Sequence, residues 1–144
     1  HVLLDIRAAS KPDIIGIAAR FLSSICKLPN PDIVVQKMLE REAQISTGIG
    51  YGIAIPHCHI EGINRSCMVA ARLAEPIDFE SLDDRPVQLV FMTASPTNTS
   101  ADYTTILKTL CQILADETTR EKLLGVETAG EFLDVIAHAE DALT

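Results

Sequence analysis

The chain of 144 residues has 20 acidic and 12 basic side chains, a net charge of −8, and a hydrophobic fraction of 47%. This composition predicts one folded domain over residues 1–144 and argues against disorder. The acidic balance excludes a nucleic-acid partner, which needs a basic face, and favours a protein that binds other proteins. No apolar run reaches the roughly 18–20 residues of a membrane span, so we expect no direct membrane insertion.

Helical signals dominate the first third of the chain. Val2–Ile6 is a short apolar run of the kind found in an edge strand. Ser10 then stands as the N-cap of a helix whose apolar residues recur at helical spacing. Asn30 caps a second helix, with a proline in the first position, and this helix fades near Glu42.

Strands and then helices follow a glycine-rich stretch. Residues 66–73 and 86–94 are rich in β-branched and apolar side chains and predict two strands, with Asp84 in a tight turn between them. These strands are too continuously apolar to face water on one side, so we expect helices over both faces. The polar segment 95–102 breaks the pattern. Three helices are then expected, at 102–115, about 118–124 and about 128–138, the last with a Thr128–Glu131 capping box. The fold class is α/β: a single domain with a mixed β-sheet flanked by helices on both faces.

Four cysteines stand at positions 26, 58, 67 and 111, without any C-x-x-C pair. Positions 26 and 111 fall within apolar helical patterns, which predicts buried thiols. A disulfide framework is not expected in so apolar a chain. This cysteine usage favours a reducing, cytoplasmic compartment.

The stretch "STGIGYGIAIPHCHI", residues 46–60, concentrates the unusual chemistry. Its three glycines, at 48, 50 and 52, permit positive φ and close approach of another group, but their spacing is neither G-x-G-x-x-G nor a P-loop. Ile53–Ile55 reads as a short strand, which Pro56 ends or places at an edge. The backbone therefore holds His57 just beyond a rigid strand end.

Four interpretations of His57 are open on the residues alone. The imidazole can be a partly buried side chain bonded to a backbone carbonyl. It can belong to a metal site with Cys58 and His59, although no further cluster supplies the ligands that zinc needs. A Cys58–His pair is disfavoured because sequence neighbours in extended chain face opposite sides. Finally, a neutral imidazole can accept a phosphoryl group if one nitrogen is tied down and cationic or N–H donors hold the phosphoryl oxygens.

Two segments carry a family resemblance: "REAQISTGIGYGIAIPH" and "EPIDFESLDDRPVQLVFMTASP". With them, nearly the whole chain resembles the EIIA domain of the fructose/mannitol family of the bacterial phosphotransferase system, including its nitrogen-regulatory branch. The resemblance implies a phosphoryl group carried on His57, on the nitrogen farther from the main chain. It implies an HPr-type phosphocarrier protein as donor, and either an EIIB domain or regulated target proteins as the next partner. It implies no metal and no cofactor.

The resemblance also suggests which residues surround the phosphoryl group. Arg41 matches the family's arginine beside the active histidine, and a guanidinium can hold phosphoryl oxygens bidentately. Thr47 and Gly48 are candidate hydroxyl and N–H donors. Tyr103 stands where the family commonly has a second histidine, and a phenol donates one hydrogen bond but is not cationic. His59, on the same side of the extended chain, is assigned to the partner surface.

Three functions follow as expectations. The first is a regulatory phosphocarrier, because Tyr103 in place of the family's histidine predicts slower transfer. The second is the EIIA part of a fructose/mannitol-type uptake system, a phosphotransferase component that passes phosphate to an EIIB cysteine. The third, from another class, is a protein-binding module in which His57 is never phosphorylated.

Overall fold

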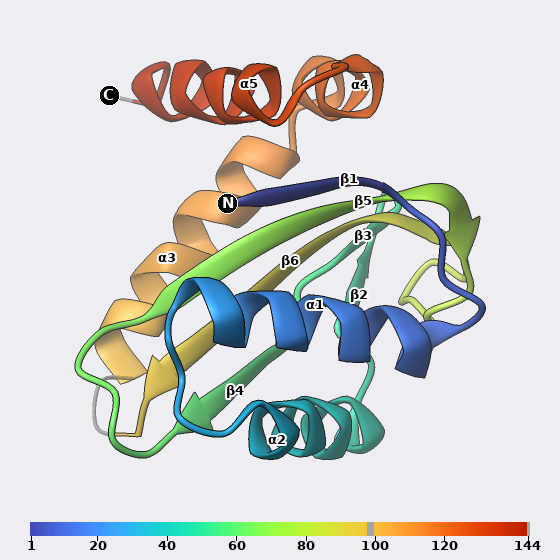
Figure 1. The fold of residues 1–144 in the computed structure, drawn as a ribbon. Coiled ribbons are helices and arrows are strands. Elements are labelled where there is room, and N and C mark those ends of the chain that lie inside the picture. The colour runs from blue at the N-terminus through green and yellow to red at the C-terminus, as the bar shows by residue number, and fades with distance from the viewer. Residues whose placement is uncertain (98–99, 144) are drawn as a thin grey trace.

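A six-stranded mixed sheet forms the centre of the computed structural model, which describes residues 1–97 and 100–143, without the side chains of 100–102 (Figure 1). The strands follow the order β1-β5-β6-β3-β2, and β4 also pairs with β6. β1 pairs in parallel with β5, and β3 and β4 each pair in parallel with β6. β5 and β6 pair with each other in antiparallel fashion. The strands are β1 (Val2–Ile6), β2 (Gly48–Gly50), β3 (Ile53–Ala54), β4 (His57–Ile60), β5 (Cys67–Ile77) and β6 (Val87–Pro96).

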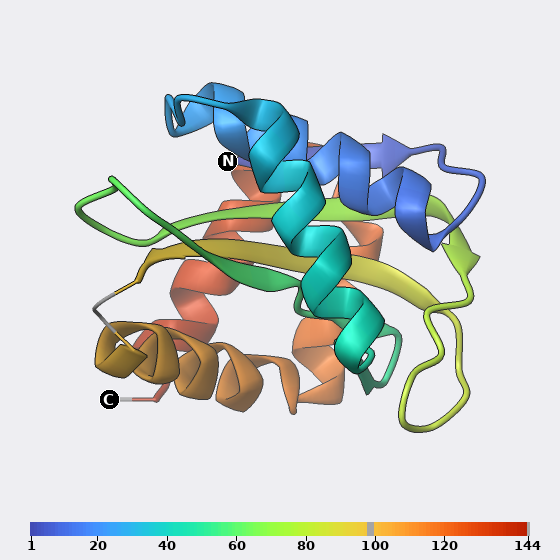
Figure 2. The ribbon, with the colours of Figure 1, turned by 90° about the horizontal axis from the view of Figure 1, so that it is seen from below.

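Helices cover both faces of this sheet. Seen edge-on in Figure 2, α1 and α2 lie on one side and α3, α4 and α5 on the other. The helices are α1 (Lys11–Ile25), α2 (Pro31–Gln44), α3 (Ser100–Leu114), α4 (Glu117–Gly125) and α5 (Ala129–Asp141). The chain is a single α/β domain, as the sequence predicts. None of the described helices combines the length and apolar character that a bilayer crossing requires.

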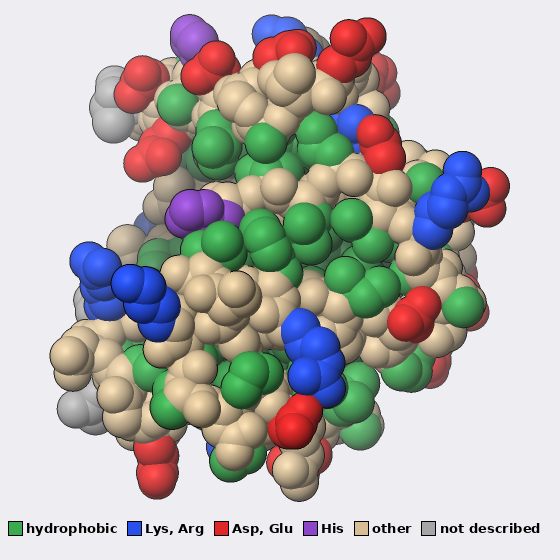
Figure 3. Space-filling view, in the orientation of Figure 1, with side chains coloured by type: hydrophobic (Ala, Val, Ile, Leu, Met, Phe, Trp, Pro, Cys, Tyr) green, Lys and Arg blue, Asp and Glu red, His purple; other side chains and the backbone are tan. Residues whose placement is uncertain are grey.

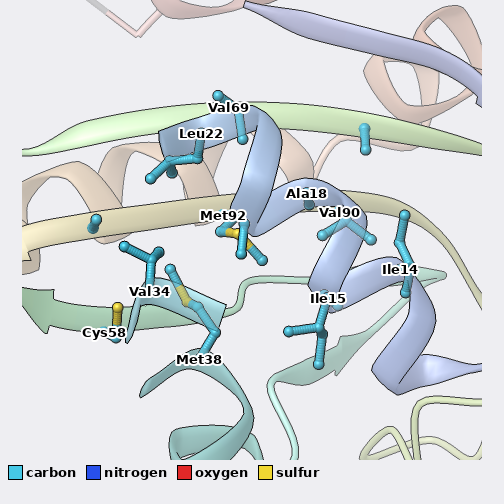
Figure 4. Close-up of a cluster of buried hydrophobic side chains, with 14 of the residues drawn as sticks. Ile14, Ile15, Ala18, Leu22, Val34, Met38, Cys58, Val69, Val90 and Met92 are labelled. Atoms are coloured by element: carbon cyan, nitrogen blue, oxygen red, sulfur yellow. The ribbon is translucent and has the colours of Figure 1, made fainter. Parts of the chain in front are cut away.

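Two hydrophobic clusters explain why β5 and β6 are apolar on both faces. One packs α1 and α2 against the sheet and includes Leu22, Met38 and Met92 (Figure 4). The other packs α3 and α5 against the opposite face, around Phe91 and Phe132. Acidic side chains gather on the outer surface over α4 and α5 (Figure 3). The surface there is unsuited to a phosphate backbone.

Local signals in the sequence are confirmed at helix ends and at one turn. The side chains of Ser10, Asn30 and Thr128 accept hydrogen bonds from the backbone N–H groups three residues on, which satisfies donors that a helix leaves unpaired. Asp84 has a φ of 58° in the turn before β6. β5 runs four residues beyond the predicted end at 73. In the predicted polar break, residues 98–99 lie outside the described part.

The glycine stretch forms three short strands, where the sequence predicted one. Gly50 and Gly52 have φ of 101° and 78° in the turn that joins β2 to β3. His57 lies beyond the end of β3, as expected, but the chain does not leave the sheet at Pro56, and His57 begins a further strand. The N–H of Thr93 donates to the Pro56 carbonyl at 3.0 Å, and β4 then continues along β6 with His57 opposite Thr93. Strands of two to four residues give too little periodicity to be recognised.

The cysteine prediction is wrong at two positions. Cys26 and Cys67 form a disulfide, with their Cα atoms 6.4 Å apart. The bond joins the end of α1 to the first residue of β5 across 41 residues, so no local sequence pattern could predict it. Cys58 is buried, and Cys111, which the sequence predicted to be buried, is half-buried; both are free thiols.

Candidate functional site

Three elements meet around His57. β4 begins with this half-buried histidine, α2 packs against β4 and brings Arg41 in its last turn, and α3 brings Tyr103 in its first turn. The structure therefore brings together the candidates from positions 41, 57 and 103. His59, two residues along β4, is exposed, and its ring centroid lies 6.2 Å from that of Tyr103.

Both nitrogens of the His57 ring have defined partners. Nδ1 lies 3.2 Å from the Ile55 carbonyl, which can only accept, so Nδ1 carries the proton. Arg41 Nε lies 3.2 Å from Nε2 and can only donate, so Nε2 is the unprotonated nitrogen. The ring is not enclosed, but its lone pair is occupied until the guanidinium moves.

The surroundings of His57 favour the neutral imidazole. Burial lowers the pKa of His57 from its ordinary value of 6.5, and the positive charge of Arg41 lowers it further. The hydrogen bond to Ile55 acts in the opposite direction. A neutral ring with a defined tautomer is the nucleophilic form of histidine.

The Arg41 guanidinium is anchored at one corner. Its Nη1 donates to the carbonyl of Ile45 at 2.9 Å, at the C-cap of the helix that carries it. Nε donates to His57, and within the described part of the chain Nη2 has no hydrogen bond or ion pair. The group can therefore rotate its free edge toward an anion bound at Nε2 while it keeps the Ile45 contact.

Tyr103 places a hydroxyl in a buried position without a partner. Its ring centroid lies 4.7 Å from that of His57, with a tilt of 36° between the planes. Within the described part of the chain the hydroxyl has no hydrogen-bond partner, although it is removed from solvent. Burial raises the pKa of Tyr103 to about 12, so the group remains a neutral donor at every physiological pH.

The expected donors Thr47 and Gly48 are both committed elsewhere. Thr47 is buried, and its N–H and its hydroxyl both donate to the Glu42 carboxylate, the hydroxyl at 2.6 Å. The N–H of Gly48 donates to Ser46 Oγ at 3.1 Å. Gly48 instead permits close packing, since a Cβ there would lie 3.0 Å from the Cα of Ser81. The geometry therefore gives no support to either residue as a direct phosphoryl contact.

A chain of hydrogen bonds nevertheless links Thr47 to the histidine. The Thr47 carbonyl accepts from the N–H of Ile55 at 3.0 Å, and the Ile55 carbonyl in turn faces His57 Nδ1. Glu42 holds the other side of Thr47 and forms an ion pair with Lys11 Nζ at 3.0 Å. Sequence reasoning missed Glu42 and Lys11 as positioning residues. The only signal was that Glu42 follows Arg41 within the conspicuous motif.

The metal and Cys58–His interpretations have no geometric support. Cys58 points into the core between α2 and the sheet, beside Val34 and Met38 (Figure 4). Burial raises the pKa of this thiol to about 12, which leaves it inert. Among the described residues, no three His, Cys, Asp or Glu side chains form a group that could hold a metal ion.

Comparisons with known proteins identify the family. Residues 1–139 match the family described as "Phosphoenolpyruvate-dependent sugar phosphotransferase system, EIIA 2". A fructose-specific EIIA component from Haloferax volcanii is 38% identical over 77% of this chain and 72% of its own length. A nitrogen regulatory protein from Bradyrhizobium diazoefficiens is 36% identical over 75% of this chain and 71% of its own. The crystal structure of nitrogen regulatory protein IIA-Ntr from Neisseria meningitidis superposes with a TM-score of 0.89 at 29% identity, over 94% of this chain and 92% of that one.

Proposed function

Since the chain belongs to the EIIA type 2 family of the phosphoenolpyruvate-dependent sugar phosphotransferase system and is an EIIA phosphocarrier, we propose that His57 carries the phosphoryl group. The observation that carries this proposal is the pair of contacts at the ring. The Ile55 carbonyl holds the proton on Nδ1, and Nε2 therefore bears the lone pair, beside the Arg41 guanidinium.

The transfer is a direct exchange between two imidazoles. The Nε2 lone pair attacks phosphorus on the phosphohistidine of an HPr-type donor, a new N–P bond forms, and the donor's N–P bond breaks with return of its electron pair to the donor ring. Nδ1 keeps its proton throughout and donates it in a hydrogen bond to the Ile55 carbonyl. The step needs no metal and no cofactor.

In this proposal two side chains hold the phosphoryl oxygens. Arg41 gives up its contact with Nε2 and turns Nε and Nη2 toward the anion, a charge-assisted interaction. The unpartnered hydroxyl of Tyr103 gains its missing acceptor in the phosphorylated state. Thr47 and Glu42 act one step removed, by fixing Ile55.

A regulatory phosphocarrier of the cytoplasm is the use of this site that we favour. Relatives of both kinds lie at similar identity, so the comparisons do not decide between regulation and uptake. Tyr103 favours regulation, because it replaces a potential cation by a neutral donor and so predicts slower turnover. In this role the phosphorylation state of His57 controls binding of target proteins, with exposed His59 in the contact surface.

A fructose-type uptake role is the second candidate, supported by the Haloferax volcanii relative. In that role His57 passes its phosphoryl group to a cysteine of an EIIB domain. The two roles differ in whether an EIIB domain accepts the group at a rate that matches arrival from the donor.

Intact-mass measurement tests the shared core of both proposals. Incubation with a phosphorylated HPr-type donor should add about 80 Da, lost after brief acid treatment. His57→Ala should abolish the gain, whereas the matched control His138→Ala, at an exposed position of α5 on the other side of the sheet, should keep it. The absence of any gain with several donors would favour a binding module that is never phosphorylated. Addition of EIIB domains to the phosphorylated protein then separates uptake from regulation.

A further inference from the structure

The disulfide between Cys26 and Cys67 lies at the edge of a cavity that the phosphocarrier chemistry does not use. Both cysteines are partly exposed, and their Cα separation of 6.4 Å falls in the ordinary range for a bridge. The cavity measures about 540 Å³ and lies between the α1–α2 connection and the β4–β5 loop. Both sulfur-bearing residues line it, so a small molecule can approach the bond from this side.

The charge around this cavity is opposite to that of the whole protein. Lys27 follows Cys26, and Arg65 stands two residues before Cys67; both are exposed and line the cavity. None of the described residues that line it is acidic, although the chain carries a net charge of −8. A small thiol that carries carboxylates is therefore attracted to the cavity that the two bridged cysteines line.

We propose that the Cys26–Cys67 pair is a thiol–disulfide exchange site for anionic low-molecular-weight thiols of the glutathione class. In a reducing compartment disulfides are commonly transient and redox-sensing, which suits a partly exposed bond beside an open cavity. The cavity volume falls within the range that accommodates ligands of tripeptide size.

The exchange runs in two balanced steps. The thiolate of the small thiol bonds to Cys26 Sγ, the Cys26–Cys67 bond breaks, and Cys67 leaves as a thiolate that takes a proton from water. Cys67 is the better leaving group because Cys26 caps the carboxyl end of α1, where the helix carbonyls disfavour a negative sulfur. A second small thiol then attacks the mixed disulfide, which releases the oxidised small-molecule dimer and leaves both cysteines reduced.

Competition among thiols of different charge tests the site. The disulfide form of the intact chain is treated at low salt with glutathione, neutral 2-mercaptoethanol or cationic cysteamine, and each rate is corrected for thiolate fraction. We expect the glutathione adduct, a gain of about 307 Da over the disulfide form because the whole thiol adds across the bond, to form about three- to tenfold faster than the cysteamine adduct. The difference should shrink at high salt. Peptide mapping should place the adduct on Cys26.

Charge-matched variants distinguish the cavity from net charge. Lys27→Gln with Arg65→Gln should remove the preference for glutathione and leave the rate with 2-mercaptoethanol unchanged. Arg7→Gln with Lys122→Gln removes the same charge from exposed positions outside the cavity and should keep the preference. A preference that survives the first pair, no exchange with any thiol, or an adduct only at Cys67 would overturn the proposal as stated.

Discussion

Removal of the Tyr103 hydroxyl should change stability and transfer in opposite directions. Before phosphorylation the hydroxyl is buried without a partner among the described residues. In the proposed function its acceptor is a phosphoryl oxygen on His57, which is present only in the phosphorylated state. Tyr103→Phe keeps the ring 4.7 Å from His57 and deletes the oxygen alone. The unphosphorylated fold therefore loses an unsatisfied polar group, and the transfer step loses a donor.

The two effects have estimable sizes. An unsatisfied buried donor costs about 1–3 kcal/mol, and recovery of the lower figure raises Tm by about 2–4 °C in a domain of this size. A hydrogen bond to a charged oxygen contributes about 1.5–3 kcal/mol. Its loss in the transition state slows phosphorylation by about 10- to 150-fold. Tyr103→His, which can supply a cation, should instead speed transfer.

Measurements of stability and of transfer rate on one preparation test both effects. Calorimetry gives Tm, and quenched intact-mass time courses give the rate of phosphorylation by the HPr-type donor. Tyr51→Phe is the matched control, because the only other tyrosine of the chain is exposed and should show neither effect. A lower Tm for Tyr103→Phe together with an unchanged rate would refute the assignment of the hydroxyl.

Three further expectations follow from the site and the disulfide. The phosphorylation rate should hold steady from pH 8 to below 6.5 and fall only as His57 protonates, because burial and Arg41 lower the pKa of His57. In Arg41→Gln the fall should begin at higher pH, and transfer should slow at least tenfold. NMR titration of the histidine and transfer kinetics measure the two effects. Glu42→Ala should lower the free energy of unfolding by about 2–4 kcal/mol, measured in urea, because the N–H and hydroxyl of Thr47 lose their acceptor; an unchanged midpoint would show that Thr47 finds another partner. Cys26→Ser should cost about 4 kcal/mol by the same assay, since the bridge closes a loop across 41 residues, and a cost near zero would mean that the bond is not formed in solution.

At the site, sequence reasoning predicted which side chains lie together better than it predicted their hydrogen-bond partners. His57, Arg41 and Tyr103 were expected to lie together, and the structure places them around one imidazole. Thr47 was expected to face the phosphoryl group, but its donors turn inward to Glu42. A hydroxyl binds whichever acceptor the packed chain presents, and that choice is not encoded at the position of the hydroxyl itself.

In the fold, the features that could be predicted correctly are those that depend on neighbours along the chain. The N-caps at Ser10, Asn30 and Thr128, the left-handed turn at Asp84 and the doubly covered strands all rest on interactions within a few residues or on hydrophobic period. Three other features arise only from long-range packing: the start of β4 directly after Pro56, the Glu42–Thr47–Ile55 chain and the Cys26–Cys67 bond. Each joins groups from separate elements, and their meeting depends on how the helices and strands pack around the sheet, which no local pattern specifies.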